Sequence, residues 1–331
     1  MTKIPAFPAF RIHDDKGRAG VEPTTIDQLG EDAVLIRVDW SSINYKDALA
    51  GTGRGKILRR FPLIGGIDLA GTVVESADKR FSAGQPVIVT GYGLSQTHDG
   101  GYSRYARVPG DWVVAMPEGM TARTAMILGT AGFTAGLALE RMEMIGLTPA
   151  HGPIAITGAT GGVGSIAIDL FTQAGYEAVA ITRKTTRADE LRGFGATRVA
   201  HPSEFDMGTR PLEAALWGGA VDSVGGELLA WLTRTTNPWG AIASIGLAGG
   251  HQLSTTVMPF ILRGVSLIGI NSADCAMDLR LKVWARLAGA NAPRHLEELV
   301  SQEIGLDELM PTFQRLLDGD HAGRTLVRLR D

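Results

Sequence analysis

Glycines gather in one short segment of the chain, residues 158–164, directly after the apolar run Ile154 to Thr157. Because glycine lacks a Cβ atom, a turn of glycines lets its backbone N–H groups approach a phosphate closely. A second apolar run, Ile166 to Phe171, follows the turn. If this run is a helix, its first turn adds unpaired N–H groups and a partial positive charge that favour an anion. The segment therefore predicts a strand, a diphosphate-binding turn and a helix, with Gly175 ending the helix.

The spacing within this turn, G-A-T-G-G-V-G, departs from the strict dinucleotide fingerprint G-x-G-x-x-G. A glycine turn with a purely structural role is the alternative interpretation. The placement of the turn between a strand and a helix favours cofactor binding. The residues expected to contact the dinucleotide are Thr160, Gly161, Gly162 and Val163.

The residues after the next predicted strand, Tyr176 to Ile181, indicate which dinucleotide binds. An acidic residue there would bind the ribose of NAD, whereas this chain has Thr182, Arg183 and Lys184. Two cations and a hydroxyl can hold a 2′-phosphate through charge-assisted hydrogen bonds. The sequence therefore predicts NADPH as the cofactor. The alternative is a solvated pair of cations before a helix capped by Thr185 or Thr186.

The order of the predicted strands and helices indicates the fold that positions these residues. Up to about residue 120, short strands alternate with turns, which is typical of a compact β-rich domain. Strands are expected at 34–40, 71–75, 86–90, 154–157, 176–182, 197–200, 220–224, 241–245 and 265–270, and helices at 121–145, 166–171, 186–193, 227–236 and after 275. The alternation beyond residue 121 predicts an α/β fold with a doubly wound parallel sheet. We expect a Rossmann NADPH-binding domain at 126–270, and a catalytic domain formed by 1–125 and 271–331.

Composition excludes several classes of function. The formal net charge is −3 and no block of like charges occurs, so nucleic acid is not an expected partner. The N-terminal residues lack a signal-peptide core, and glycines interrupt the apolar stretch at 126–139, so we expect a soluble, cytoplasmic protein with no membrane partner. Cys275 is the only cysteine, which excludes an intrachain disulfide and a thiolate metal cage. No serine lies in a G-x-S-x-G nucleophile elbow, which argues against a hydrolase of that type.

Seven local motifs, in order along the chain, carry a resemblance to a known family. They are Ser41–Leu49, Gly65–Gly71, Asp99–Ser103, Gly110–Trp112, Gly129–Ala135, Gly246–Gly250 and Val257–Leu262. With the order of domains, they resemble the medium-chain dehydrogenase/reductase superfamily, and within it the zinc-free acryloyl-CoA reductase branch, often called quinone oxidoreductases. The resemblance implies that the β-rich catalytic domain is GroES-like.

The resemblance also shows which positions to inspect for zinc ligands. The zinc alcohol dehydrogenases of the superfamily carry Cys-x-x-Asp where this chain has Asn44 to Asp47, and Gly-His-Glu where it has Gly66, Ile67 and Asp68. Both metal-binding side chains are therefore missing, and no two histidines stand three or four residues apart. We expect no metal site.

Without a Lewis acid, reduction of an already activated C=C bond is the natural chemistry. The resemblance implies NADPH-dependent reduction of acryloyl-CoA to propanoyl-CoA, with hydride added to Cβ and a proton to Cα. Two alternatives remain open: a quinone or general enone reductase, and a non-catalytic NADPH-binding protein.

The resemblance assigns candidate roles to residues of the first domain. Tyr45 stands where the family places a tyrosine beside the nicotinamide, and it could orient the cofactor or donate a proton; core packing is the alternative. Asn44 and Asp47 are candidates for fixing the loop and the cofactor ribose, although Asp47 could equally cap a helix. Arg324 is a candidate cofactor contact, or else an ordinary surface cation.

Three further groups complete the predicted site. The segment from Gly129, with Thr130 and Thr134, is expected to begin a helix under the cofactor, with tight helix packing as the alternative. Gly246 and Leu247 end a predicted strand, where open α/β sheets bind ligands. The cations available for the phosphates of coenzyme A, or otherwise solvated in a surface loop, are Arg54, Lys56, Arg59 and Arg60.

The segment Val265 to Ile270 reads as an edge strand that could pair with its copy in a second chain. We therefore expect a homodimer.

Overall fold

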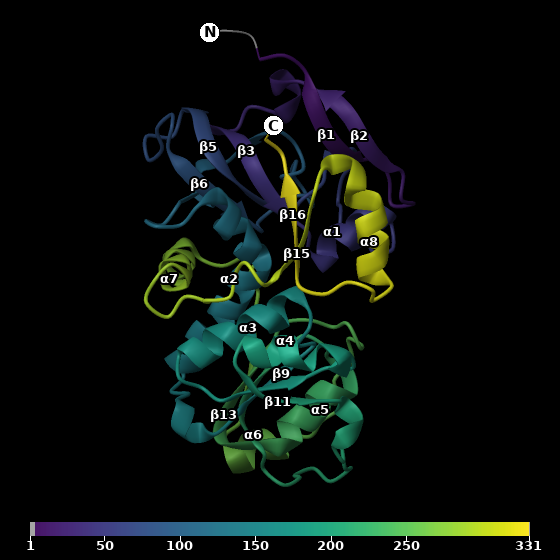
Figure 1. Cartoon of the computed structure of the whole chain (residues 1–331), viewed down its shortest axis with the longest axis vertical. Coiled ribbons are helices and arrows are strands. Elements are labelled where there is room, and N and C mark those ends of the chain that lie inside the picture. Colours follow the sequence, from purple (N-terminus) through teal and green to yellow (C-terminus); the bar gives the residue numbers. More distant parts are fainter. Residues whose placement is uncertain (1–3, 331) are drawn as a thin grey trace. The chain divides into compact units, whose positions relative to one another are not determined.

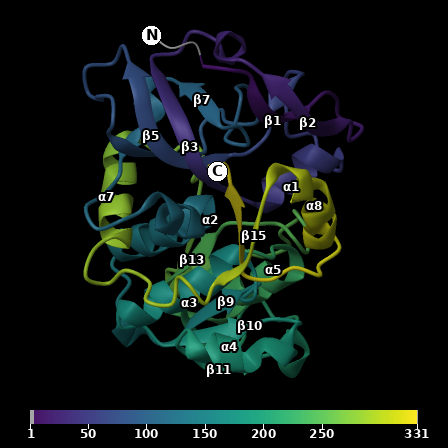
Figure 2. The ribbon, with the colours of Figure 1, turned by 45° about the horizontal axis from the view of Figure 1, so that its top comes forward.

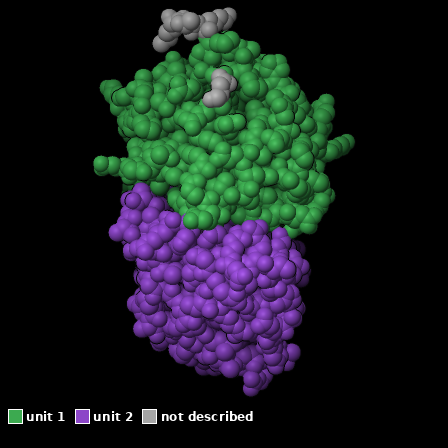
Figure 3. All heavy atoms as spheres, in the orientation of Figure 1, with its two compact units in different colours: residues 1–130, 273–281, 296–331 green, residues 131–272, 282–295 purple. Residues whose placement is uncertain are grey.

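The computed structural model describes residues 4–330, which form two compact units (Figure 3). Unit 1 contains the described residues up to Thr130, together with Ala273–Leu281 and those from Leu296 onward. Unit 2 contains Ala131–Ser272 and Lys282–His295.

A seven-stranded sheet forms the centre of unit 1. Its strands are β3 (Val34–Ser42), β5 (Asp68–Ser76), β6 (Pro86–Thr90), β7 (Tyr105–Val108), β8 (Val114–Ala115), β15 (Val300–Ile304) and β16 (Arg324–Arg328). The order is β15-β16-β3-β5-β6-β8, and β7 also pairs with β3. All neighbouring pairs are antiparallel except β15 and β16. Since β16 pairs with β3, the C-terminal segment returns to the first unit, as the sequence predicted.

A smaller sheet and two helices complete the core of unit 1. The strands, in the order β2-β1-β4, are β1 (Phe7–Ile12), β2 (Ala19–Thr24) and β4 (Leu63–Ile64). Helices α1 (Tyr45–Thr52) and α8 (Leu309–Leu317) lie side by side (Figures 1 and 2). The rings of Phe10 and Phe313 meet edge to face within this core. Burial of such large apolar side chains is what holds the β-rich unit together.

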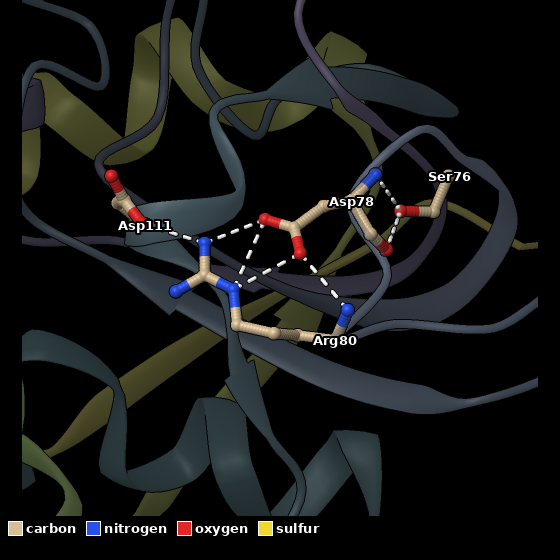
Figure 4. A network of polar contacts seen from close by, with 4 residues as sticks. All are labelled: Ser76, Asp78, Arg80 and Asp111. Atoms are coloured by element: carbon tan, nitrogen blue, oxygen red, sulfur yellow. Dashed lines mark hydrogen bonds and ion pairs between the residues drawn. The ribbon is translucent and has the colours of Figure 1, made fainter.

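A polar network fastens the turn after β5 at the surface of unit 1 (Figure 4). The Arg80 guanidinium donates to both carboxylate oxygens of Asp78 and, at 2.6 Å, to Asp111. The hydrogen bonds from Arg80 lower the pKa of Asp78 to about 2. Asp78 is thus ionised throughout the physiological range, and the network stays intact there.

Six parallel strands form the sheet of unit 2. They are β9 (Ile154–Thr157), β10 (Ala178–Ile181), β11 (Ala196–Ala200), β12 (Trp217–Asp222), β13 (Thr236–Ser244) and β14 (Ser266–Gly269). The order β11-β10-β9-β12-β13-β14 reverses direction between β9 and β12. Open α/β sheets bind ligands at such a switch point, at the carboxyl ends of the strands. The predicted α/β fold with a Rossmann-type parallel sheet is confirmed.

The strands of unit 2 are connected and covered by helices (Figure 1). They are α3 (Gly162–Gln173), α4 (Ala188–Gly193), α5 (Gly226–Thr235) and α6 (Met258–Arg263). Two further helices cross the boundary between the units along the chain: α2 (Ala122–Met144), which is broken at Gly129, and α7 (Met277–Leu287).

The end of α7 does not belong to the unit that was predicted for it. The prediction placed all of residues 271–331 in the first domain. Residues 282–295 belong to unit 2. The Trp284 ring stacks on Phe133 of α2 at 5.9 Å, and Lys282 and Arg286 pair with Glu140. The amphipathic pattern after residue 275 predicted the helix, but a pattern does not state which unit its apolar face meets.

Among the described residues, only α2 is long and apolar enough to pass a test for a membrane span. Within its most apolar window, 78% of the residues are buried in the fold, as in the core helix of a globular protein.

Candidate functional site

The glycine turn after β9 has the shape that a diphosphate requires. Gly158 has φ +62°, and a Cβ on Gly164 would lie 2.5 Å from the Gly158 carbonyl oxygen. Neither position tolerates a side chain without strain. Gly161 is exposed at the N-terminus of α3, and Gly162 and Val163 form its first turn. The N–H groups of Gly162 and Val163 lie in the first helical turn and have no intrahelical partner, whereas the Gly161 N–H donates to the Gly158 carbonyl oxygen at 2.9 Å. The start of α3 can therefore receive an anion.

The residues after β10 are the predicted contacts of the 2′-phosphate. Thr182 is buried; its Oγ1 accepts from the Lys184 N–H at 3.1 Å and lies 3.4 Å from Oγ1 of Thr160. Through these contacts, Thr182 helps to hold the conformation of the loop after β10. Arg183 is exposed, and within residues 4–330 no acidic side chain forms an ion pair with it. Neither Thr185 nor Thr186 caps the following helix, because both lie in a 3₁₀ turn and α4 has no side-chain cap. The alternative that Arg183 and Lys184 are a solvated pair stays open.

The ends of β12 and β13 meet closely at Gly246. A Cβ there would lie 2.6 Å from the Ser223 carbonyl oxygen. Asp222, fully buried at the end of β12, accepts from Thr157 Oγ1 at 2.6 Å and from the Gly225 N–H at 2.8 Å. Burial raises the pKa of Asp222. Sequence reasoning missed this carboxylate, which links the end of β9 to the loop after β12 at the carboxyl edge of the sheet. Leu247, the residue after Gly246, is exposed.

In unit 1, Tyr45 is the first residue of α1, and the residue is 48% exposed. This exposure makes the alternative of core packing wrong. Within the described part of the chain, its hydroxyl forms no hydrogen bond. A phenol held on a helix terminus with a free hydroxyl is available to a ligand.

Asn44 and Asp47 form a capping box at the start of α1. The Asp47 carboxylate accepts from the Asn44 N–H at 2.9 Å and from the Ile67 N–H at 2.9 Å. Asp47 is 1% exposed. Its carboxylate is thus engaged with the backbone, which favours the helix-capping interpretation over contact with the cofactor ribose.

Asp68, which the sequence analysis did not select, is the centre of the unit 1 site. Its buried carboxylate accepts from Ser42 Oγ at 2.7 Å and Asn44 Nδ2 at 2.8 Å. It also accepts from the Thr130 N–H at 2.9 Å and Thr130 Oγ1 at 2.5 Å. Asp68 therefore fixes Asn44 and Thr130, two predicted cofactor residues far apart in sequence. Only its place in the Gly66-to-Asp68 motif could have signalled this role.

The break in α2 makes the contact with Thr130 possible. Gly129 has φ +50°, and a Cβ there would lie 2.6 Å from Asp68 Oδ2. The helical segment therefore restarts at Thr130, close to the predicted beginning, with its first N–H capped by a carboxylate. Thr134, one turn later, is buried.

Arg324 is 2% exposed, so the alternative of an ordinary surface cation is wrong. Its guanidinium donates to the carbonyl oxygens of Ile127 and Ile43 and to Ser42 Oγ at 2.8 to 3.1 Å. With its donors bound by the protein, Arg324 acts on the site through Ser42 and Asn44. The sequence could not reveal this, because an arginine on a strand near the terminus looks like a solvent-exposed one.

The buried charges of this cluster do not balance, because two carboxyl groups, Asp47 and Asp68, face one cation. Burial, and then the negative charge of Asp68, raise the pKa of Asp47 to about 7. The hydroxyl of the fully buried Tyr102 donates to the Ser42 carbonyl at 3.1 Å, and burial raises its pKa well above the usual value. A proton held by Asp47 relieves the excess negative charge near neutral pH.

This proton makes stability depend on pH. Since the pKa of Asp47 is higher in the folded than in the unfolded chain, its contribution is fully present below about pH 4 and is lost as pH rises through 7. The loss amounts to at most about 4 kcal/mol. The variant Asp47→Asn, whose side chain at position 47 cannot ionise, should remove this part of the dependence of the free energy of unfolding on pH. Denaturant unfolding between pH 4 and 8 measures it, with the exposed Asp15→Asn as control. Equal slopes in wild type and Asp47→Asn would contradict the raised pKa.

The structure separates the predicted coenzyme A cations. Arg54 pairs with Asp318 at 3.1 Å, whereas Arg59 and Arg60 are exposed and, within residues 4–330, have no ion-pair partner. Lys56 is also exposed.

The residues at the family's zinc positions do not suit zinc. Asn44 donates its side-chain N–H to two carboxylates, and Ile67 has no donor atom for a metal. Among residues 4–330, no group of three His, Cys, Asp or Glu side chains is arranged to hold an ion.

Comparison with known proteins shows which family has this combination of fold and site. The family model described as "Alcohol dehydrogenase GroES-like domain" matches residues 30–118, and that described as "Zinc-binding dehydrogenase" matches residues 162–288. A probable acrylyl-CoA reductase of Escherichia coli is 46% identical, over 96% of this chain and 97% of the relative. A putative quinone oxidoreductase of Bacillus subtilis is 46% identical, over 98% and 99%.

Solved structures agree with these relatives. The YhdH oxidoreductase from Salmonella enterica in complex with NADP has a TM-score of 0.94 at 43% identity, covering 98% of this chain and 100% of that one. The Bacillus subtilis protein yhfP with NAD bound has a TM-score of 0.94 at 44% identity, with coverages of 98% and 100%.

A Rossmann-type unit joined to a GroES-like unit defines an oxidoreductase of the medium-chain dehydrogenase/reductase superfamily. Within that superfamily the chain belongs to the zinc-free acryloyl-CoA reductase and quinone oxidoreductase-like branch.

Proposed function

We propose that the protein reduces the C=C bond of a short enoyl-CoA, acryloyl-CoA in the first place, with NADPH and without a metal. The observation that carries the proposal is the exposed Tyr45 at the start of α1, together with Asn44 and Ile67 at the family's zinc positions. Chemistry there must rely on a substrate activated by its own conjugation. Similarity to an acrylyl-CoA reductase along nearly the whole chain supports the same substrate class.

In this proposal, each unit supplies residues with a different role. The turn at Gly161 to Val163 would hold the diphosphate of the cofactor and Arg183 its 2′-phosphate, while the backbone at Gly246 borders the ligand edge of the sheet. When bound, NADPH supplies a hydride for the β-carbon of the substrate. Tyr45 then donates a hydrogen bond to the enolate, and is the candidate source of the proton for the α-carbon. Asp68, Arg324 and Thr130 keep Asn44, next to Tyr45, in place.

Consumption of NADPH with acryloyl-CoA, crotonoyl-CoA and a benzoquinone, measured side by side, tests the substrate. We expect acryloyl-CoA to be turned over with the highest kcat/KM. Rapid turnover of the quinone alone would favour the second candidate, a quinone oxidoreductase, for which the similarity to the Bacillus subtilis protein speaks. No turnover of any substrate, with tight binding of NADPH, would favour a non-catalytic binding protein.

Arg183 should set the preference for NADPH. The variant Arg183→Glu replaces an unpaired cation by an anion at the predicted 2′-phosphate, so it should raise the KM for NADPH roughly tenfold or more. The KM for NADH, which lacks that phosphate, should change little. Steady-state kinetics with both cofactors measure the difference, and equal effects would overturn the assignment.

We also propose a cytoplasmic homodimer. In the described sheet β14 is an edge strand. The side chains of Val257, Ile261 and Leu262, which precede it in the chain, and of Trp239 on the neighbouring strand β13 are more than half exposed. An unpaired strand beside exposed apolar side chains favours association with a second copy. Size-exclusion chromatography with light scattering should give twice the chain mass of 35.1 kDa, and Ile261→Asp should weaken the dimer. A monomer at micromolar concentration would contradict the proposal.

A further inference from the structure

Strands β9 and β12 separate at the switch point of the unit 2 sheet, where a pair of side chains continues their contact. Their main-chain ladder ends at Ile156 and Val221, whereas the ladders to their other neighbours run one residue further. Those next residues are Thr157 and Asp222, and both are fully buried. The Thr157 hydroxyl donates to Asp222 Oδ1 at 2.6 Å and accepts from the Ser223 N–H at 3.1 Å. This pair, the Thr157–Asp222 link, stands where the main-chain pairing stops.

Asp222 extends the link to the loops after β12 and β13. Its second carboxylate oxygen accepts from the N–H of Gly225, the N-cap residue of α5, at 2.8 Å. Its carbonyl oxygen accepts from the N–H groups of Ile245 and Gly246 at 2.9 and 3.3 Å. Asp222 therefore holds the end of β9, the start of α5 and the end of β13 together.

The loop after β13, residues 246–250, lies directly against the loop after β12. The Gly249 N–H donates to the Val224 carbonyl at 2.8 Å. Gly225 and Gly250 form a parallel bridge, and a Cβ on Gly225 would lie 2.4 Å from the Gly250 carbonyl oxygen. The conformation of the 246–250 loop therefore depends on the loop that the Thr157–Asp222 link holds.

The order of the strands indicates which half of the cofactor meets this region. A dinucleotide lies across the point where the strand order reverses, here between β9 and β12. The 2′-phosphate, which belongs to the adenosine half, is assigned to Arg183 after β10, on one side of β9. The nicotinamide half then lies on the other side, at the ends of β12 and β13.

We propose that the Thr157–Asp222 link positions the backbone of Gly246 for the nicotinamide half of NADPH, and that it strengthens cofactor binding without touching the cofactor. The proposal rests on the cofactor contacts proposed above, but not on the identity of the substrate. Thr157 and Asp222 are positioning residues, because both are fully buried. A loop that is already held in the binding conformation loses less freedom when the ligand binds.

Calorimetry of the full-length protein with NADPH and with 2′,5′-ADP, which lacks the nicotinamide half, tests the proposal. Thr157→Val removes the hydroxyl and keeps the shape of the side chain, so the Kd for NADPH should rise roughly fivefold to tenfold. The Kd for 2′,5′-ADP should stay within about twofold, because the adenosine half binds at a separate site. Thr157→Ser retains the hydroxyl and should bind NADPH as the wild type does. Thr236→Val is the matched control, because it removes a buried hydroxyl that donates to the Leu232 carbonyl at the other end of β13.

Asp222→Asn gives an independent test of the same link. Both carboxylate oxygens of Asp222 accept hydrogen bonds, whereas an amide has only one acceptor oxygen. This variant should also lose affinity for NADPH and retain that for 2′,5′-ADP.

Three results would overturn the proposal. They are an unchanged Kd for NADPH in Thr157→Val and Asp222→Asn, equal losses of affinity for NADPH and 2′,5′-ADP, and a Thr157→Ser variant as weak as Thr157→Val. Equal losses for the two ligands would assign the link a general role in the fold. Because binding is measured without a substrate, failure of the wild type to reduce acryloyl-CoA would overturn the proposed function alone.

Discussion

Tyr45→Phe should lower kcat for enoyl-CoA reduction roughly a hundredfold or more, because a positioned proton donor contributes about that much to catalysis. The hydroxyl is the only group removed, and nearly half of the side chain is exposed, so the free energy of unfolding should not change measurably. Rapid-mixing kinetics with acryloyl-CoA measure the loss, and binding of NADPH should remain at its wild-type affinity.

Tyr105→Phe removes the same hydroxyl from a half-buried tyrosine on β7 and is the matched control, with activity unchanged. A Tyr45→Phe enzyme with full activity would remove proton donation from the mechanism. A variant with normal kcat and weaker NADPH binding would leave Tyr45 the role of orienting the cofactor.

Arg324→Met should reduce the free energy of unfolding by about 3 to 5 kcal/mol, the usual cost of removing one partner from a buried charged cluster. The carbonyl oxygens of Ile127 and Ile43 would lose their donor, and Asp68 would face Asp47 without a cation nearby. Denaturant unfolding at pH 7 measures the change. Methionine fills much of the arginine volume, which keeps a cavity from adding to the result.

Arg328→Met provides the control on the same strand, because Arg328 is exposed and its loss should change the free energy of unfolding by less than about 0.5 kcal/mol. Equal stabilities of the Arg324 and Arg328 variants would show that the buried guanidinium is not needed for the fold of unit 1.

Local patterns were sufficient for part of the scaffold. Ile154 to Thr157 and Pro86 to Thr90 occupy the predicted strands with identical limits, because each is an apolar run between glycine or proline turns. The glycine turn was equally predictable, since Gly158 and Gly164 have a steric reason to be glycine.

The buried cluster of unit 1 was only half predictable. Asn44, Asp47 and Thr130 were selected by resemblance, but Asp68, which holds two of them, received attention only as the residue at a lost metal position. Side chains separated by sixty or more residues meet through strand pairing and through the break at Gly129, and no local spacing encodes that meeting. For the same reason Arg324 looked like a surface residue.

The central claim, that hydride goes to Cβ and a proton to Cα of an enoyl-CoA, is tested most directly by isotope placement. Acryloyl-CoA is reduced in normal water with NADPH carrying deuterium at the transferred C4 position, and the propanoyl-CoA formed is analysed by NMR. We predict one deuterium at the β-carbon; the converse experiment, unlabelled NADPH in deuterated water, should place deuterium at the α-carbon. Propanoyl-CoA without deuterium at the β-carbon in the first experiment, or no propanoyl-CoA at all, would contradict the account.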